Sequence, residues 1–337
     1  MNSFHIVVIG NSETALVCSL TAQKTYPDKK VALIINSRRN EFINRLFNSG
    51  SFNNGDNGVV VMADEVITRN ENVIGLMGGE EINFEKLVVA TGSVAIQPHI
   101  EGVDKEDVYF INKDPDDLLI IKNRALDAEN IVIYGGGYIG VVMTDELLHE
   151  GKNVTLVERT NRLLPSSIDL EVSKEAKNIL EAQGGRIIFK SKVRQVFGNK
   201  KISGVRLRDG EVLGCDYLII CCGERPETKL AEKFGLVYDN DRGILVDEYQ
   251  RTSDKNIFAV GECAARFDFF CGDLSDFTLS TTRLEEAKLI GSNLYSVIYN
   301  RGRLNDYISE RNNIRTSIQK SLKSSDYINI KQFIDTI

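Results

Sequence analysis

The chain has 337 residues, which is enough for two domains of ordinary size. Its 41 basic and 48 acidic residues give a net charge of −7, and no basic run is longer than a pair, so neither nucleic acid nor an anionic membrane surface is expected as a partner. The 6 cysteines lack C-x-x-C spacing, which indicates reduced, mostly buried thiols in a cytoplasmic protein, and no apolar run approaches the roughly 20 residues that cross a bilayer.

The chain opens with an apolar strand at 5–9, so its first residues do not resemble a signal peptide. Gly10, Ser12 and Ala15 follow at the spacing G-x-G-x-x-G, before a helical stretch and a second strand that leads to Asn36. Alanine is a tolerated variant of the third glycine, whereas Ser12 adds a side chain where the backbone should approach a phosphate. Asn36 stands where an acid would bind a ribose, and it offers a hydrogen bond without the charge. This segment is an imperfect dinucleotide-binding turn.

Arg45 and a polar stretch rich in Asn and Gly at 48–58 come next, followed by two β-type runs. Residues 80–93 then show a strand pattern that ends in Ala90, Thr91 and Gly92. The segment 94–103 contains a proline and a glycine, and it is predicted to be a connection rather than an element.

The strongest local signal is a strand, a glycine turn, a helix and a second strand at 131–158. Gly135 allows the tight turn, Gly137 lets the backbone approach a pyrophosphate, and Gly140 lets the helix pack closely on the strand. The first N–H groups of the helix and its dipole would face the phosphates. Glu158 ends the second strand, where a carboxylate accepts hydrogen bonds from an adenosine ribose. We therefore predict that a dinucleotide binds here.

The remainder of the chain is predicted to contain a helix at 169–185, antiparallel strands at 186–220, and strands at 243–247 and 257–262. Thr282 and Glu285 fit a capping box that opens a further helix. Residues 301–337 are polar and have no assigned role. Cys221 and Cys222 are adjacent at the end of a strand, where their side chains should point to opposite faces as two small core residues.

Two glycine turns, a strand ending in Ala-Thr-Gly and a late T-x5-F-A-V-G-E motif occur in this order. Together they make the chain resemble the two-dinucleotide-domain flavoprotein reductases, the pyridine nucleotide-disulfide oxidoreductase superfamily, over residues 5 to about 297. Within that superfamily the chain is most similar to the branch of NADH-dependent rubredoxin reductases, NADH oxidases and nitrite reductase flavin modules. The tripeptides at 10–12 and 261–263 carry this finer resemblance.

The resemblance implies an α/β fold with two Rossmann-like domains, in which an NAD(H)-binding domain at 104–247 is inserted into an FAD-binding domain at 1–103 and 248–300. It implies that FAD is held by Gly10, Ser12, Ala15, Asn36, Arg45, Ala90, Thr91, Gly92, Gly261, Glu262, Thr281 and Thr282. It implies that NAD(H) is held by Gly135, Gly137, Tyr138, Ile139, Gly140, Glu158, Arg159 and Gly223. The N-terminus of the helix that opens near Thr281 and Thr282 would stabilise negative charge on the flavin.

Three departures from the family pattern modify this expectation. The segment after Arg45 is shorter than in the family by some tens of residues, so one wall of the flavin site is expected to be missing. Val142 stands where many relatives carry a glutamate near the nicotinamide. The family's C-terminal interface domain is expected to be absent, with the tail at 301–337 in its place.

The leading hypothesis is an FAD-dependent NAD(P)H oxidoreductase that passes hydride from NADH to flavin and electrons on to an external acceptor, such as a small redox protein, a quinone or oxygen. No side chain is assigned a catalytic role. His5, His99 and His149 are scattered, so no metal site is predicted, and a dithiol-disulfide reductase would require a paired redox cysteine that the sequence lacks. The alternative is a degenerate relative that binds a nucleotide without turnover, as a sensor or an assembly subunit. The sequence leaves the acceptor and the oligomeric state open.

Overall fold

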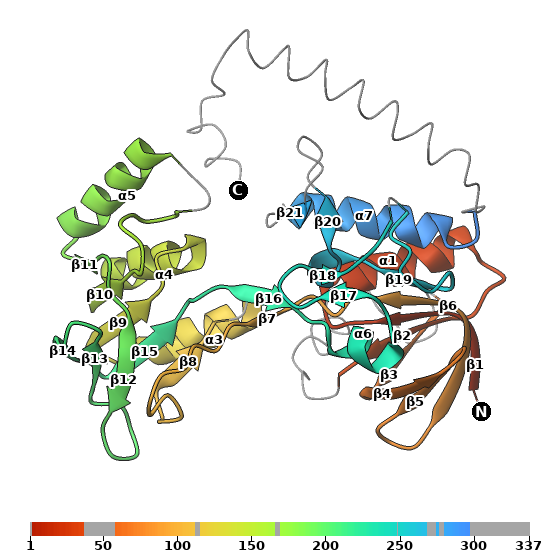
Figure 1. Ribbon diagram of the computed structural model, residues 1–337, viewed down its shortest axis with the longest axis horizontal. Helices are drawn as coiled ribbons and strands as arrows, with labels where there is room; N and C mark the ends of the chain where they lie inside the picture. Colours follow the sequence, from red (N-terminus) through yellow and green to blue (C-terminus); the bar gives the residue numbers. More distant parts are fainter. Residues whose placement is uncertain are drawn as a thin grey trace, which may run out of the picture.

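A computed structural model of the chain describes residues 2–36, 58–111, 115–165, 169–247, 249–267, 274–275 and 280–296. The described residues form two halves, each built on a sheet with parallel strands and helices packed against it (Figure 1). The predicted fold class, α/β with two Rossmann-like sheets, is confirmed.

The first sheet has a parallel centre in which the strand order is β3-β2-β1-β6-β19. Both faces of such a sheet are covered, so its strands are continuous apolar runs, and every residue of β2 is buried. An antiparallel hairpin, β4 and β5, extends the first half of β6, whose second half pairs with β19. The strands are β1 (Asn2–Ile9), β2 (Val31–Ile35), β3 (Val59–Ala63), β4 (Val66–Asn70), β5 (Val73–Leu76), β6 (Glu81–Val89) and β19 (Ile257–Ala259).

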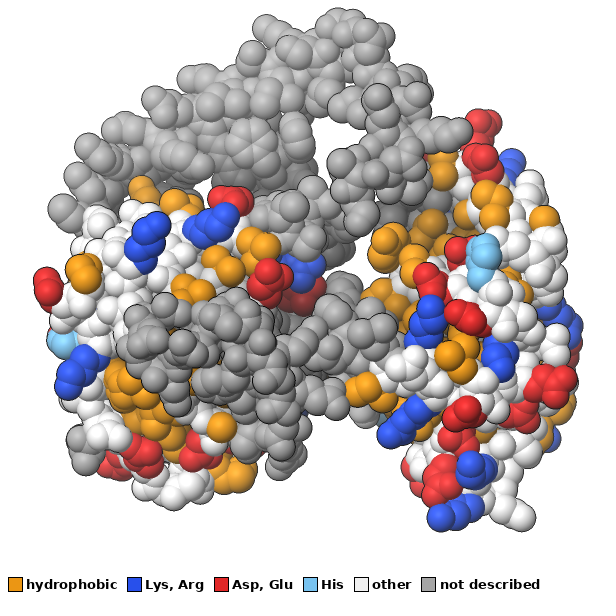
Figure 2. Space-filling view, turned by 180° about the vertical axis from the view of Figure 1, so that it is seen from behind, with side chains coloured by type: hydrophobic (Ala, Val, Ile, Leu, Met, Phe, Trp, Pro, Cys, Tyr) orange, Lys and Arg blue, Asp and Glu red, His pale blue; other side chains and the backbone are white. Residues whose placement is uncertain are grey.

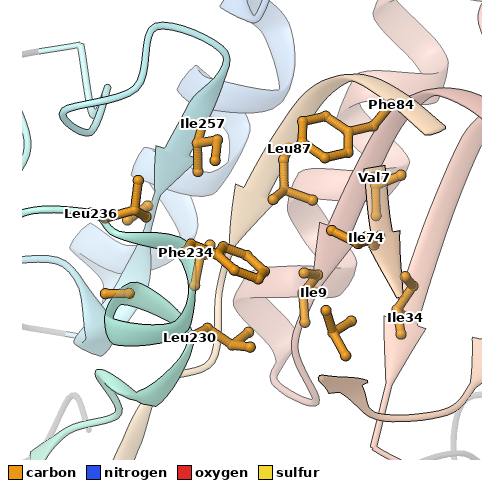
Figure 3. Close-up of a cluster of buried hydrophobic side chains, with 14 of the residues drawn as sticks. Val7, Ile9, Ile34, Ile74, Phe84, Leu87, Leu230, Phe234, Leu236 and Ile257 are labelled. Carbon is orange, nitrogen blue, oxygen red and sulfur yellow. The ribbon is translucent and has the colours of Figure 1, made fainter. Parts of the chain in front are cut away.

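Helices cover both faces of the first sheet. On one face α1 (Glu13–Thr25) and α7 (Ser280–Asn293) pack side by side. On the other face lies the short helix α6 (Lys229–Phe234), and Figure 3 shows Leu230 and Phe234 among the buried side chains of the sheet. Both faces of the sheet are therefore covered by apolar layers. Polar loops can lie at its carboxyl edge, because that edge is not covered by these layers.

The second sheet is parallel throughout, with the strand order β11-β10-β9-β15-β8. An antiparallel sheet of three strands, β12-β13-β14, shares one apolar cluster with it. The helices are α3 (Pro115–Ala125), α4 (Tyr138–His149) and α5 (Leu170–Ala182). The strands are β8 (Val108–Phe110), β9 (Asn130–Tyr134), β10 (Asn153–Val157), β11 (Arg186–Ile188), β12 (Val193–Phe197), β13 (Gly204–Leu207), β14 (Val212–Gly214) and β15 (Tyr217–Ile220).

A two-stranded antiparallel ribbon runs between the two halves (Figure 1). Its strands are β7 (Ser93–Ala95) and β16 (Glu224–Pro226). The sequence analysis predicts a connection without an element at 94–103, and the structure corrects this only at Val94 and Ala95. Strand β7 finds its partner about 130 positions away, beyond the reach of any local pattern. The remaining short elements are η1 (Gly261–Cys263), β17 (Tyr238–Asp239), β18 (Gly243–Ile244), β20 (Arg266–Phe267) and β21 (Leu274–Ser275).

Three other local predictions need correction. Residues 186–220 do not form one antiparallel region, because β11 and β15 at its two ends pair in parallel with the second sheet. Only Gly243 and Ile244 of the strand predicted at 243–247 pair. Helix α7 begins at Ser280, so Thr282 lies inside the first turn rather than ahead of it, and Glu285 binds Lys288 Nζ at 2.7 Å instead of capping the helix.

The surface carries mixed charge. On the face drawn in Figure 2, basic side chains alternate with acidic ones, and the coloured residues form no continuous basic surface. Among the residues that the structure describes, no helix is long and apolar enough to cross a membrane. Both findings agree with the composition.

Candidate functional site: two dinucleotide-binding turns

The glycine turn of the second half lies between β9 and α4 at the carboxyl edge of the parallel sheet. Gly135 has a φ of +118°, and a Cβ built there would overlap the carbonyl oxygen of Cys221, the residue after β15. A Cβ on Gly140 would overlap the carbonyl oxygen of Gly135. Both glycines are therefore required by close backbone approach, one between neighbouring strands and one between helix and turn.

Gly137 has a different environment. It is the N-cap residue of α4, makes no side-chain capping bond, and has open space where a Cβ would stand. The first N–H groups of a helix of 12 residues therefore face an open, uncapped position. Such a position attracts an anion because unpaired N–H groups and the positive end of the helix dipole coincide.

Glu158 follows β10 and is only 6% exposed. Its Oε2 accepts a hydrogen bond from the backbone N–H of Gly136 at 2.6 Å, and its Oε1 accepts one from the N–H of Thr160 at 2.6 Å. A carboxylate offers about four acceptor positions, so two remain for a ribose. Arg159 beside it is exposed.

The first turn of α4 presents two predicted residues differently. Tyr138 is 62% exposed, whereas Ile139 is partly buried against the core of the second half. Val142, one turn further along, is 40% exposed. The structure thus leaves an exposed apolar side chain on α4 at the position where the family resemblance implied a glutamate.

The turn of the first half repeats this construction. A Cβ on Gly10 would overlap the carbonyl oxygen of Ala90, just as Gly135 meets Cys221. Ser12 is the N-cap of α1, the same place that Gly137 holds in α4, and its hydroxyl accepts from the N–H of Ala15 at 3.3 Å. The serine that replaces the middle glycine is therefore a helix cap.

In both halves a hydrogen bond links the glycine turn to the residue after the second strand, but donor and acceptor are exchanged in the first half. Here the backbone N–H of Asn36 donates to Oδ1 of Asn11 at 2.8 Å. The turn residue is the acceptor, and the residue after the second strand is the donor. Glu13 also lies in the first turn of α1, where its carboxylate complements the helix dipole.

The strand end at Ala90, Thr91 and Gly92 meets the return segment from the second half. The hydroxyl of Thr91 donates to the carbonyl oxygen of Glu227 at 3.2 Å, and the N–H of Glu227 donates to the carbonyl oxygen of Gly92 at 2.9 Å. Gly223 accepts at 2.9 Å from the N–H of Ile96. The predicted residues on these two segments are thus brought together by the ribbon of β7 and β16.

Glu262 lies in η1, directly after β19, and both carboxylate oxygens are engaged. Oε1 is 2.7 Å from Nη1 of Arg283 in the first turn of α7, and Oε2 accepts from the hydroxyl of Ser93 at 2.8 Å. The same hydroxyl lies 2.9 Å from Oε2 of Glu224. Gly261 packs beside Thr14 of α1, so this cluster adjoins the first glycine turn.

Some predicted site residues lie beyond what the structure describes. Arg45 is outside the described residues, as are the tail at 301–337 and nearly all of the polar stretch at 48–58. Thr281 and Thr282 lie in the first turn of α7, where only their backbone is described.

Sequence reasoning missed four residues around the turns, namely Asn11, Glu13, Ser93 and Arg283. Their neighbours in the chain carried the recognisable motifs, but their own roles depend on partners from other elements. Arg283 was read only as part of a helix-opening pattern. An arginine in the first turn of a predicted helix, where the helix dipole disfavours a cation, is the signal that could have drawn attention to it.

The five cysteines that the structure describes are free and lie in buried or partly buried surroundings. Cys263 is fully buried, and its Sγ lies 3.3 Å and 3.4 Å from the carbonyl oxygens of Val260 and Val89. Burial raises the pKa of its thiol, and burial raises the pKa of the Cys222 thiol to about 12. Cys221 and Cys222 pack in separate clusters on opposite faces of the sheet, as predicted. Across the described part of the chain, His, Cys, Asp and Glu form no group of three that could hold a metal ion.

The residues present fit two dinucleotides, the second half more fully than the first. In the second half an uncapped helix N-terminus, an open glycine and a carboxylate bound to the glycine turn lie at one edge of the sheet. In the first half the strands, turn and helix keep the same arrangement, but Ser12 already occupies one N–H and Glu13 adds a negative charge. Two sheets of this construction define a protein with two dinucleotide-binding domains.

The chain belongs to the pyridine nucleotide-disulphide oxidoreductase family, whose sequence profile matches residues 4–288. It is 30% identical to an NADH oxidase of Methanocaldococcus jannaschii over 64% of this chain and 48% of that one. It is 27% identical to a rubredoxin-NAD(+) reductase of Pseudomonas putida over 66% of this chain and 57% of that one. The chain therefore spans about half the length of these relatives.

Solved structures agree with this family. An FAD-dependent pyridine nucleotide-disulphide oxidoreductase from Desulfovibrio vulgaris is 26% identical and superimposes with a TM-score of 0.72, over 87% of this chain and 71% of that one. A water-forming NADH oxidase from Lactobacillus brevis bound to NADH shares the fold, with a TM-score of 0.74 at 21% identity, over 87% of this chain and 69% of that one.

Proposed function

We propose that this protein is an FAD-dependent NADH dehydrogenase that passes electrons to an external acceptor without a redox-active disulfide. The single observation that carries the proposal is the repeated turn, in which Gly10 meets Ala90 and Gly135 meets Cys221 in the same way. One such turn supports one dinucleotide, and an electron-transfer flavoprotein of this kind needs two. FAD, when bound, accepts hydride and releases electrons singly or in pairs, which no amino-acid side chain does.

The role of the protein's own residues would be to bind and orient the two cofactors. In the second half, the N-terminus of α4 and Gly137 would hold the pyrophosphate of NADH, and Glu158 would hold its ribose. In the first half, the N-terminus of α1 and the turn that begins at Gly10 would hold the pyrophosphate of FAD, and Glu262 would bind its ribityl region. The ribbon of β7 and β16 joins the two halves, which would allow nicotinamide and flavin to be brought together.

We further propose where the two domains divide. Residues 229–246 contribute Leu230, Phe234 and Ile244 to the core of the first half, although the sequence analysis assigned them to the inserted domain. The inserted NAD(H)-binding domain would then end near β16, and the FAD-binding domain would resume there rather than at 248. The ribbon is the natural boundary, because it is the place where the chain passes between the cores.

A small redox protein is the acceptor that we favour, with a quinone or oxygen as alternatives. The support is that relatives over this segment include rubredoxin-NAD(+) reductases and a nitric oxide reductase FlRd-NAD(+) reductase. The free thiols among the described residues support a reducing, cytoplasmic setting. A sensor or assembly subunit is the second candidate, since Ser12 and Glu13 both weaken the first turn as a phosphate site.

The deciding experiment is an absorption spectrum of the purified protein under anaerobic conditions, before and after NADH is added. We expect a flavin spectrum between 350 and 500 nm, roughly the range typical of bound flavins, that bleaches with NADH and recovers when an electron acceptor is admitted. No flavin spectrum after incubation with excess FAD would favour the sensor. A flavin spectrum that NADH leaves unchanged would exclude NADH dehydrogenase activity and would still support FAD binding.

A further inference from the structure

Arg283 occupies an unfavourable place for a cation. It lies in the first turn of α7, where the helix dipole presents its positive end. Its side chain is only 20% exposed, so solvent screens this repulsion poorly. An arginine held in such a place needs a compensating partner.

That partner is Glu262, whose Oε1 lies 2.7 Å from Nη1 of Arg283. The carboxylate is also 20% exposed, and its second oxygen is bound by the hydroxyl of Ser93. The side chain of Glu262 is therefore fixed by contacts from α7 and from the segment after Gly92. A carboxylate held on two sides has lost most of its rotational freedom before any ligand arrives.

Docking of α7 does not explain this ion pair. The helix is already attached by Ala287, Ile290 and Leu294, which are buried against α1 and the first sheet. A partly buried ion pair contributes little net stability compared with apolar residues of similar volume, because both charges lose hydration. The ion pair is therefore better explained by a role in the candidate site at the carboxyl edge of the first sheet.

A further observation points in the same direction. Nε of Arg283 is buried and has no hydrogen-bond partner among the residues that the structure describes. Guanidinium N–H groups are strong donors, and buried ones are nearly always satisfied by protein, water or ligand. The unpartnered donor lies on the residue that holds Glu262, next to the carboxyl edge of the first sheet.

We propose that Arg283 is a positioning residue for the flavin site, which fixes the Glu262 carboxylate and adds a fixed positive charge at the start of α7. This inference rests on the proposed function, because it takes FAD as the ligand of the first half. Arg283 neutralises Glu262, so that the acid can accept hydrogen bonds without placing an uncompensated negative charge beside a group that gains electrons. The positive charge also makes electron uptake by the flavin more favourable and so raises its midpoint potential.

The test compares Arg283→Met, Arg283→Lys and a matched control, Arg251→Met. Arg251 forms a partly buried ion pair with Asp247 at 2.7 Å, and its side chain is 14% exposed. Its backbone pairs with Phe258 in the middle of β19, not with the segment after β19 that carries Glu262. For each protein we would measure the Kd for FAD by flavin fluorescence, the midpoint potential of bound flavin, and the Tm without FAD.

For Arg283→Met we expect the Kd for FAD to rise by about tenfold or more, since a hydrogen-bonded charge has lost its partner, and the midpoint potential to fall. Arg283→Lys should restore part of the flavin midpoint potential but less of the affinity for FAD. Lysine keeps the positive charge but lacks the planar guanidinium with its fixed set of N–H donors. Arg251→Met should lower the Tm without changing either flavin property. If Arg283→Met fails to fold, Ser93→Ala tests the second contact on Glu262, and its Kd for FAD should also rise.

Three outcomes would overturn the inference. The first is an Arg283→Met or Ser93→Ala protein with unchanged Kd and potential. The second is an Arg251→Met protein that shows the same flavin changes, which would reduce Arg283 to a structural ion pair. The third is a wild-type protein that binds no FAD, which refutes the proposed function as well and is recognised directly from the wild-type titration.

Discussion

The carboxylate of Glu158 accepts a hydrogen bond from the backbone N–H of Gly136, with 2.6 Å between Oε2 and the nitrogen. The acid at the end of β10 therefore holds the glycine turn that follows β9, so that the residues proposed to bind the ribose and the phosphates share one hydrogen-bonded unit. The corresponding contact in the first half runs the other way, from the N–H of Asn36 to Oδ1 of Asn11. The two turns of this protein are alike in backbone path and different in charge.

The choice between NADH and NADPH should depend on Glu158. Its carboxylate can accept from the 2′-OH of NADH and would repel the 2′-phosphate of NADPH. Glu158→Ala should raise the Kd for NADH by about ten- to a hundredfold, since a hydrogen bond to a charged group contributes about 1.5–3 kcal/mol, and should improve NADPH binding. Calorimetric titration of both nucleotides measures the change. A wild-type protein that prefers NADPH would show that Glu158 is misassigned and that the exposed Arg159 binds the phosphate.

Two glycines of the second turn should respond oppositely to alanine. Gly137→Ala meets open space, so it should cost less than about 1 kcal/mol of stability while weakening NADH binding. Gly140→Ala places a methyl group on the carbonyl oxygen of Gly135 and should cost about 1–3 kcal/mol or more. Thermal unfolding and NADH titration separate the two effects. Equal loss of Tm in both variants would contradict the distinction between a ligand-facing glycine and a packing glycine.

Removal of charge at Glu13 should strengthen FAD binding. Its carboxylate lies in the first turn of α1, next to the turn proposed to hold the FAD pyrophosphate. Glu13→Gln should lower the Kd for FAD by about two- to fivefold, because a charge near a helix terminus contributes about 0.3–1 kcal/mol. The Tm without FAD should fall slightly, since the helix dipole loses a favourable charge. If Glu13→Gln instead binds FAD more weakly than the wild-type protein at low salt, Glu13 contacts the cofactor favourably.

No cysteine should be needed for electron transfer. Burial raises the pKa of Cys263, and it raises that of Cys222 to about 12, so near neutral pH both remain thiols and are poor nucleophiles. Alanine variants of Cys221, Cys222 and Cys263 that still fold should reduce flavin with NADH at the wild-type rate, measured by stopped-flow absorbance. Loss of that reaction in Cys263→Ala alone, with FAD still bound, would refute the prediction.

The attachment of the chain after α7 should depend on pH. The hydroxyl of Tyr295 donates to Oε2 of Glu85 at 2.7 Å, and this hydrogen bond is the main reason that the pKa of Glu85 lies below its ordinary value of 4.5. A lowered carboxyl pKa contributes stability above the unfolded pKa, and that stability is lost as the pH falls through the folded pKa. Tyr295→Phe should therefore lower the Tm by about 1–2 °C at pH 7, because an exposed charged contact contributes under about 1 kcal/mol.

The same variant should approach the wild-type Tm as the pH falls through the lowered folded pKa of Glu85, below which this carboxyl is protonated in both proteins. Thermal unfolding at pH 7 and pH 3 checks this. A Tm difference that is constant over this range would assign the effect of the Tyr295 hydroxyl to its other hydrogen bond, to the carbonyl oxygen of His5 at 3.3 Å, rather than to the carboxylate.

The sequence by itself determined the fold class, the two glycine turns and the order of the strands that carry them. Local patterns suffice there, because a buried parallel strand is a continuous apolar run and a glycine turn needs its glycines within a few positions. The family followed from the same motifs in order. Gly135 and Gly140 could be assigned their tasks in the turn before any neighbour was known, since each task is a property of the backbone at that position.

Only the tertiary structure decided which side chains complete the site. Ser93, Glu262 and Arg283 come from three segments far apart in the chain, and no local period links them. The ribbon of β7 and β16 escaped prediction for the same reason, as did the return of 229–246 to the first core. Hydrogen bonds and ion pairs depend on distances between atoms of remote residues, and those distances exist only once the sheets have formed and packed.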